Sequence, residues 1–139
     1  MAVSSWFSDL SQSSDEKWAS GSLSATRTTG GGVFAWQNPE STAVIIDRVI
    51  IDVTTAATST VCTVDIGYTA TSATTSDDDL LDGVAFTSAG VYDNTVNIGT
   101  NGKGVQKAAA GKWVTATEKT GDVTGLAGKF YLHYRRIRA

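Results

Sequence analysis

Two neighbouring segments of this 139-residue chain alternate between apolar and polar residues over long runs. In residues 60–69 every second side chain is suited to a buried face, namely Cys62, Val64, Ile66 and Tyr68. Residues 43–55 form a longer pattern that is apolar on both faces in its first half, which is typical of a central strand covered on both sides. Patterns of period two on this scale favour a β fold over a helical one.

Shorter strand patterns occupy residues 33–36, 91–98, 113–118 and 129–138, and turn residues separate them. Asn101-Gly102 marks a turn, and the segments around it are a candidate hairpin. The regular spacing predicts an all-β, antiparallel sandwich or barrel, with residues 21–139 as one domain. The alternation predicts one core that contains Ile45, Val49, Ile51, Val64, Ile66, Phe130 and Leu132.

Residues 1–20 follow a different pattern and are predicted to be an N-terminal arm. Val3, Trp6, Phe7 and Leu10 fall at i, i+3, i+4 and i+7, which is one stripe of a short helix. Ser13 and Glu16 have the spacing of a capping box. The stripe needs a partner surface, and two interpretations stay open. The arm packs on its own domain, or it reaches a neighbouring subunit or another protein.

The composition contains few residues suited to catalysis. His133 and Cys62 are the only histidine and cysteine, too few for a structural zinc site, so we expect no enzyme activity and no cofactor. Cys62 is expected to be a small buried hydrophobic residue, and His133 a solvent-facing or interface residue opposite Phe130. The net charge of −3 gives no general attraction to nucleic acid. The start of the sequence has no signal-peptide pattern, and no apolar run is long enough for a membrane span, so we expect neither secretion nor a membrane partner.

Two charged segments are candidate binding sites. The segment SDDDLLDG contains Asp77, Asp78, Asp79 and Asp82, without the spacing of an EF-hand loop. A solvated loop is the expected role, with Asp77, Asp79 and Asp82 left as candidate cation ligands. The C-terminal strand carries Lys129, Arg135, Arg136 and Arg138, and these are expected to form ion pairs within the chain or to dock on an acidic protein surface.

Residues 30–136 resemble a group of small structural proteins encoded among the head and tail genes of tailed bacteriophages. Five segments carry the resemblance: GGVFAWQNPE, AVIIDRVIIDVTT, TVDIGYTA, TTSDDDLLDGV and KFYLHYRRI. Such proteins are mostly capsid decoration (cement) proteins with β-sandwich or jelly-roll bodies. The resemblance implies a non-enzymatic virion protein, made in the host cytoplasm, that binds the major capsid protein on the outer head surface and forms a homotrimer.

The residues expected to contact the capsid or a neighbouring subunit come from the arm and the basic tail: Val3, Trp6, Phe7, Leu10, Arg135, Arg136 and Arg138. The arm lies outside the resemblance, so its role rests on its apolar stripe alone. The alternative function is a carbohydrate-binding β-sandwich adhesion module of a phage tail or tail fibre. Exposed, coplanar Trp or Tyr side chains near the aspartate segment would favour this alternative, because aromatic rings form platforms for sugars. The four tryptophans, Trp6, Trp18, Trp36 and Trp113, are otherwise expected in core and interface packing.

Overall fold

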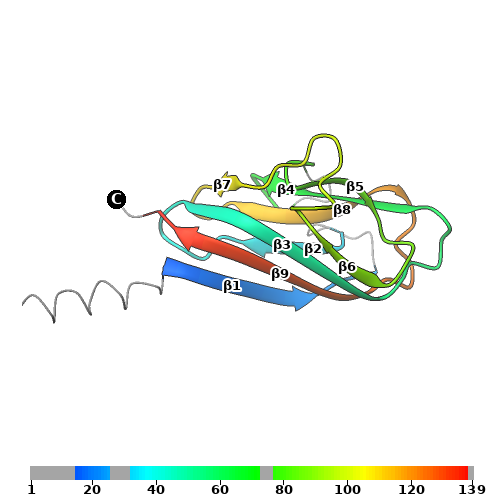
Figure 1. The fold of residues 1–139 in the computed structure, drawn as a ribbon. Helices are drawn as coiled ribbons and strands as arrows, with labels where there is room; N and C mark the ends of the chain where they lie inside the picture. The colour runs from blue at the N-terminus through cyan, green and yellow to red at the C-terminus, as the bar shows by residue number, and fades with distance from the viewer. Residues whose placement is uncertain (1–14, 26–31, 73–76, 138–139) are drawn as a thin grey trace, which may run out of the picture.

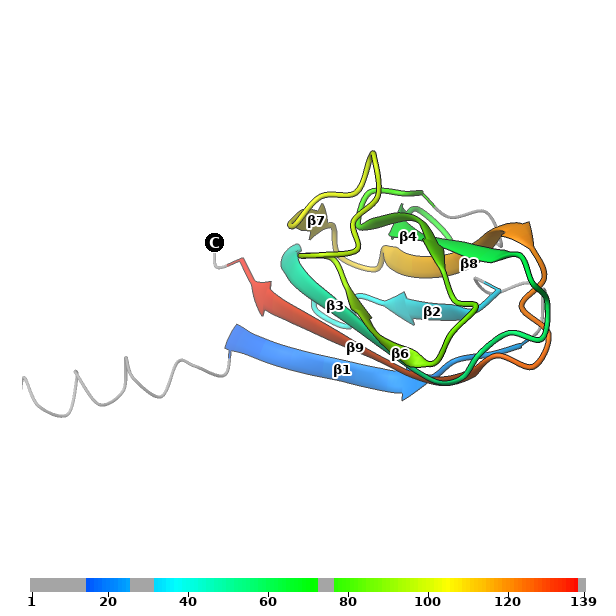
Figure 2. The same cartoon turned by 45° about the vertical axis from the view of Figure 1, so that its right-hand side comes forward.

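The computed structural model describes residues 15–25, 32–72 and 77–137, which form two antiparallel β-sheets packed face to face (Figures 1 and 2). Sheet A has the order β1 (Glu16–Ser22), β9 (Ala127–Arg136), β3 (Val44–Thr55) and β6 (Gly90–Asp93), and β7 (Gln106–Ala108) also pairs with β3. Sheet B has the order β2 (Phe34–Gln37), β8 (Trp113–Gly121), β4 (Cys62–Thr69) and β5 (Leu81–Ala85). The predicted antiparallel β-sandwich is confirmed.

The chain crosses repeatedly between the two sheets, and the facing orders β1-β9-β3-β6 and β2-β8-β4-β5 are those of a jelly roll. β6 and β7 share one edge of β3, because β7 pairs with Val44–Ile46 and β6 pairs with residues 50–53. The hairpin predicted around Asn101-Gly102 is therefore wrong. The strands on either side of that turn lie one after the other along β3 instead of pairing with each other.

One apolar core fills the space between the sheets. Six of the seven residues predicted for it are buried, namely Val49, Ile51, Val64, Ile66, Phe130 and Leu132. Aromatic contacts join the layers, because the Phe34 and Phe130 rings stack at 4.1 Å and the Trp36 and Tyr134 rings lie 5.0 Å apart. Gly21 makes room for this packing, since a Cβ atom there would lie 2.6 Å from the Phe130 ring.

Ile45 is the exception, and a β-bulge in β3 explains it. Ile46 pairs with Tyr134 and Arg48 with His133, so Asp47 is an extra residue in β3. The inward face therefore consists of Val44 and Ile46 before the bulge, and of Val49, Ile51 and Val53 after it. Ile45 points outward and is only partly buried, because an added residue moves every preceding side chain to the opposite face.

Buried Asn94 stabilises this bulge from the turn that follows β6. Its side-chain oxygen accepts a hydrogen bond from the Val49 N–H at 2.8 Å, and its amide donates to the Asp47 and Gly104 carbonyls at 3.4 and 3.1 Å. The main-chain groups that the bulge removes from the strand ladder therefore have partners, as buried polar groups require.

The sheet begins earlier than the sequence indicated. β1 starts at Glu16, so residues 16–20, which were assigned to the arm, are paired with β9 from Glu16–Arg135 to Ser22–Lys129. Glu16 is a strand residue and not the end of a helical capping box. Along this segment Glu16, Trp18 and Ser20 are exposed, and Lys17 and Ala19 between them are less exposed. Pairing with the long strand β9 therefore outweighs the local helical pattern of the sequence. Residues 1–14 of the predicted arm lie outside the described residues.

Candidate interaction surface

The outward side of sheet A presents an aromatic surface, which we call the Trp18 face. It consists of the outward residues of β1, β9 and β3 around Trp18: Glu16, Trp18, Ser20, Tyr131, His133, Arg135, Ile45 and Ile50. The strand register places Trp18 beside His133, and Ser20, Tyr131 and Ile50 in the next row. Trp18 is 58% exposed, whereas Trp36 and Trp113 are partly buried.

His133 is held in place on this face by two neighbours. Its ring lies 4.7 Å from the Trp18 ring, and its Nδ1 lies 2.5 Å from Oδ1 of Asp47, the bulge residue. The histidine faces outward, opposite Phe130 and Leu132, as the alternation predicted. Cys62 lies in the core of sheet B, where burial raises the pKa of its thiol, so the structure does not bring the cysteine and the histidine together. Cys62 is buried, as expected.

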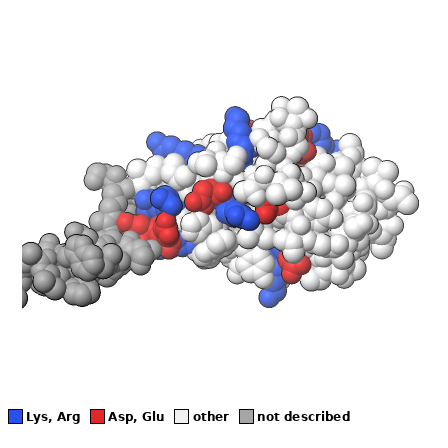
Figure 3. Space-filling view, in the orientation of Figure 1, with Lys and Arg blue, Asp and Glu red and all other residues white. Residues whose placement is uncertain are grey.

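The charged side chains beside Trp18 are paired with one another. Arg135 donates to Glu16 at 2.7 Å and lies 3.9 Å from Asp47, and further along the face Arg48 donates to Asp93 at 2.9 Å. Figure 3 shows blue and red side chains next to each other on this side of the molecule, with white surface between such groups. Such ion pairs add little stability, but they leave the surroundings of Trp18 with balanced charge.

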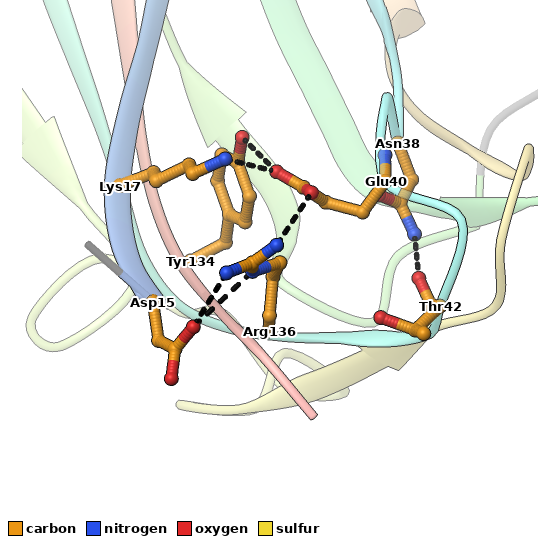
Figure 4. A network of polar contacts seen from close by, with 7 residues as sticks. All are labelled: Asp15, Lys17, Asn38, Glu40, Thr42, Tyr134 and Arg136. Carbon is orange, nitrogen blue, oxygen red and sulfur yellow. Dashed lines mark hydrogen bonds and ion pairs between the residues drawn. The ribbon is translucent and has the colours of Figure 1, made fainter. Parts of the chain in front are cut away.

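A second polar cluster lies where β1 begins (Figure 4), and we call it the Glu40 cluster: Asp15, Lys17, Glu40, Tyr134 and Arg136. Lys17 donates to Glu40 at 2.6 Å and the Tyr134 hydroxyl donates to the same oxygen at 3.3 Å. Arg136 donates to Asp15 from Nε at 3.2 Å and from Nη2 at 2.8 Å, and its Nη1 lies 3.8 Å from Glu40. The cluster therefore connects Asp15, just before β1, to the last strand, β9.

Hydrogen bonds and charges keep Glu40 ionised. The hydrogen bond from Lys17 lowers the pKa of Glu40, and the charges of Lys17 and Arg136 act in the same direction against partial burial. Burial, followed by the nearby carboxylate of Glu40, raises the pKa of Tyr134. Buried Asn38 positions the loop that carries Glu40, because its side chain accepts from the Glu40 N–H at 2.9 Å and donates to the Thr42 carbonyl at 3.0 Å (Figure 4).

Two aspartates of the acidic segment, which runs from the loop after β4 into β5, have lysine partners within the chain. Asp82 pairs with Lys119 and accepts from the Asn101 N–H at 3.1 Å, and the hydrogen bond from Lys119 lowers the pKa of Asp82. Asp79 lies 3.6 Å from the Lys103 ammonium group. Asp77 accepts from the N–H of its neighbour Asp78 at 2.9 Å. Residues 15–25, 32–72 and 77–137 contain no group of three or more His, Cys, Asp or Glu side chains arranged to hold a metal ion.

The structure describes only two of the residues predicted to contact the capsid or a neighbouring subunit. Arg135 and Arg136 belong to the two surfaces above and have carboxylate partners in the same chain. Val3, Trp6, Phe7, Leu10 and Arg138 lie outside the described residues. Sequence reasoning assigned Trp18 to core or interface packing without predicting its exposure, and it missed the Lys17–Glu40 pair. The alternation of residues 16–22 was the available signal, because it separates outward Trp18 from Lys17.

In the part of the chain that the structure describes, we find no helix with the length and apolar character needed to cross a membrane.

No family model and no curated protein matches the sequence. Among solved structures, a chain from the capsid of Ralstonia phage GP4 matches with a TM-score of 0.54 and 17% sequence identity. The match covers 89% of this chain and 86% of that chain, so it extends over nearly the whole of both. At this identity the likeness shows that the two chains share a fold.

Proposed function

We propose that this chain is a non-enzymatic structural protein of a tailed-phage virion, and specifically a decoration protein that binds the outer surface of the head. The observation that carries the proposal is the fold shared with a phage capsid chain over 89% of the present chain. The resemblance of residues 30–136 to phage head and tail proteins supports it independently. The proposed partners are the major capsid protein and further copies of the chain, in a homotrimer. The protein would be made in the host cytoplasm and act on the particle.

The physical character of the surface suits this role. A decoration protein stabilises a shell by binding the assembled form, so each bound copy shifts the equilibrium away from disassembly. Many weak contacts across a lattice are sufficient, because binding at several points raises the effective concentration at each. The chain offers a sandwich whose charges are paired beside an exposed aromatic residue, Trp18, and this residue can anchor a contact between copies of the chain.

A carbohydrate-binding adhesion module is the second candidate function, and exposed Trp18 favours it. A tryptophan ring on a sheet face can stack against the apolar side of a sugar ring. Trp18 does not form a flat aromatic platform with its neighbour, however, since the His133 ring is inclined to it by 46°. The partly buried Trp36 and Trp113 add no second exposed tryptophan in the described residues.

The test is to add the purified protein to heads of the parent phage that lack it. We expect saturable binding, and decorated heads should withstand higher temperature or lower salt before they release DNA. A chain without residues 1–12 measures the contribution of the arm, and weaker binding of this chain is expected. Failure of the full chain to bind heads, together with retention on a host polysaccharide column, would replace decoration with the adhesion function.

A further inference from the structure

We propose that the Trp18 face of one subunit binds the N-terminal arm, residues 1–14, of a second copy of the chain. This inference rests on the self-association proposed above and names the surfaces that produce it. Three features carry the argument: an open aromatic face, the charge of the arm, and the point at which the arm joins the sheet.

The Trp18 side chain of this face is left largely uncovered by the other described residues. Trp18 is 58% exposed on a sheet surface, with His133 against one side of its ring and exposed Ser20 in the next outward position on the strand. Exposed tryptophans that sit among partly buried residues such as Tyr131 and Ile50 are the kind of anchor that interfaces use. Such a face is stabilised when another apolar surface covers it.

The charges define what kind of segment can cover it. Glu16, Arg135 and Asp47 are already paired with residues of the same face. A charged segment that covered this face would therefore bury its own charges without partners. The arm, MAVSSWFSDLSQSS, has Asp9 as its single charged side chain and carries the apolar residues Val3, Trp6, Phe7 and Leu10. A nearly uncharged, apolar segment matches a face whose charges are balanced.

The attachment point favours a second copy over the same chain. The arm joins the sheet at Asp15, which Arg136 binds through two nitrogen atoms. Strand alternation puts Lys17 on the side of β1 opposite Trp18, and Asp15, just before the strand, binds Arg136 of the same Glu40 cluster. To reach its own Trp18, about 10 Å away at roughly 3.3 Å per residue, the arm would have to reverse at a fixed residue and cross the sheet edge. Fourteen residues span about 20 Å as helix and up to about 46 Å when extended, which is enough to reach a neighbour.

An arm that enters the next subunit is a head-to-tail contact, in which two different surfaces of the chain meet. Such contacts close into rings when the rotation between subunits permits it. The homotrimer proposed above is one such ring. The Trp18 face then lies between subunits, and capsid binding uses other surfaces.

Disulfide trapping tests this contact in purified protein without capsids. Cys62 is completely buried, so a cysteine introduced at the surface is the reactive thiol. One chain carries Phe7→Cys and a second carries Ser20→Cys, and the two are mixed and oxidised gently. We expect a mixed disulfide between the two chains at least about tenfold more abundant than with the control partner Ala85→Cys. Ala85 is an exposed residue of β5 in sheet B.

A mixed disulfide no more abundant than the Ala85 control would overturn the proposal. A doubly substituted chain that closes the bond only within itself would also overturn it, in favour of an arm that folds back. As a second measurement, Trp18→Ser should weaken self-association at least tenfold by sedimentation velocity, while Trp18→Tyr weakens it less. Unchanged association of Trp18→Ser would contradict the contact. Because these experiments contain no heads, their failure leaves decoration itself to be judged by the head-binding assay.

Discussion

The outward sides of the two sheets differ in what covers them. On sheet B the chain covers its own surface: Gly67 and Thr115 are buried although they point away from the core, and the Asp77 carbonyl lies directly over Gly67. Thr115 finds a polar partner there in the Thr69 hydroxyl, at 3.4 Å. On sheet A the corresponding outward residue of β1, Trp18, is 58% exposed.

This difference indicates where a partner can bind. The segment that covers sheet B is held by Lys103, which pairs with Asp79, and by Asn101, which donates to Asp78, so intrachain contacts cover this part of the sandwich. Sheet A has charge pairs but no segment among the described residues that lies over Trp18. Sheet A therefore offers the open side at which the proposed contact between copies of the chain would form.

The largest expected effect is a difference in stability between substitutions on the inward and outward sides of β3. Ile46→Ala should lower the free energy of unfolding by about 2–5 kcal/mol, because Ile46 is completely buried. Ile45→Ala, one residue away on the outward side of the bulge, should cost less than half as much. Chemical denaturation of both variants gives the comparison, and equal losses would show that the bulge is placed wrongly.

A glycine pair sharpens the description of sheet B. A Cβ atom at Gly67 would lie 2.2 Å from the Asp77 carbonyl oxygen, so the covering segment must move, and Gly67→Ala should cost about 1–3 kcal/mol. Gly104→Ala is the matched control, since a Cβ atom there meets nothing within 4 Å. Thermal unfolding that gives the two variants the same midpoint would mean that the acidic segment does not cover sheet B.

The Glu40 cluster predicts a smaller, pH-dependent effect at the base of the arm. The pKa of Glu40 is lowered in the folded protein, chiefly by Lys17, below its ordinary value of 4.5. Its contribution to stability is therefore fully present above about pH 4.5 and is lost as the pH falls through the folded pKa. In Lys17→Met the folded pKa moves back toward the ordinary value, so less stability is lost on acidification.

The measurement for this cluster is the unfolding midpoint between about pH 2 and 7. Asp82 and Asp93 also have lowered pKa values, and the comparison with wild type removes their contribution. Lys107→Met, at an exposed position of β7, is the control and should follow the wild-type profile. Profiles of Lys17→Met and wild type that differ by a constant at every pH would contradict the assignment.

The smallest expected effect on stability is at Trp18 itself. Because its side chain is largely exposed, Trp18→Ser should change the free energy of unfolding by no more than about 0.5 kcal/mol in the isolated subunit. The measurement is chemical denaturation at a concentration low enough for the wild type to be monomeric. A loss above about 2 kcal/mol there would show that Trp18 is a structural residue of its own sheet and not a free surface.

The sequence predicted the class of fold because alternation is a local signal. Residues 60–69 and 129–136 show it without interruption, and both form strands with the expected faces. In β3 both faces of the first half are apolar, so Ile45 and Ile46 were equally good core residues by pattern alone. The bulge decides between them, and it depends on Asn94, which lies 45 residues from Val49 along the chain.

The candidate surface was harder to predict from the sequence than the fold. Because residues 3–10 have helical spacing, the predicted arm was extended to residue 20 and included Trp18. In the structure, pairing with β9 places the residues from Glu16 onward in the sheet. Arg135 and Arg136 were identified as interaction residues, but their carboxylate partners Glu16 and Asp15 come from the other end of the chain. Contacts between such distant segments follow from the topology and not from local composition.

The central claim, a decoration role on the head, is tested most directly by cryo-electron microscopy of intact particles of the parent phage. We predict density for the two-sheet sandwich on the outer surface of the head, in symmetric groups around its threefold positions. In that density β1 and the Trp18 face should lie between neighbouring copies. Density for the sandwich at the tail or tail fibre, with bare shell at the head, would contradict the account.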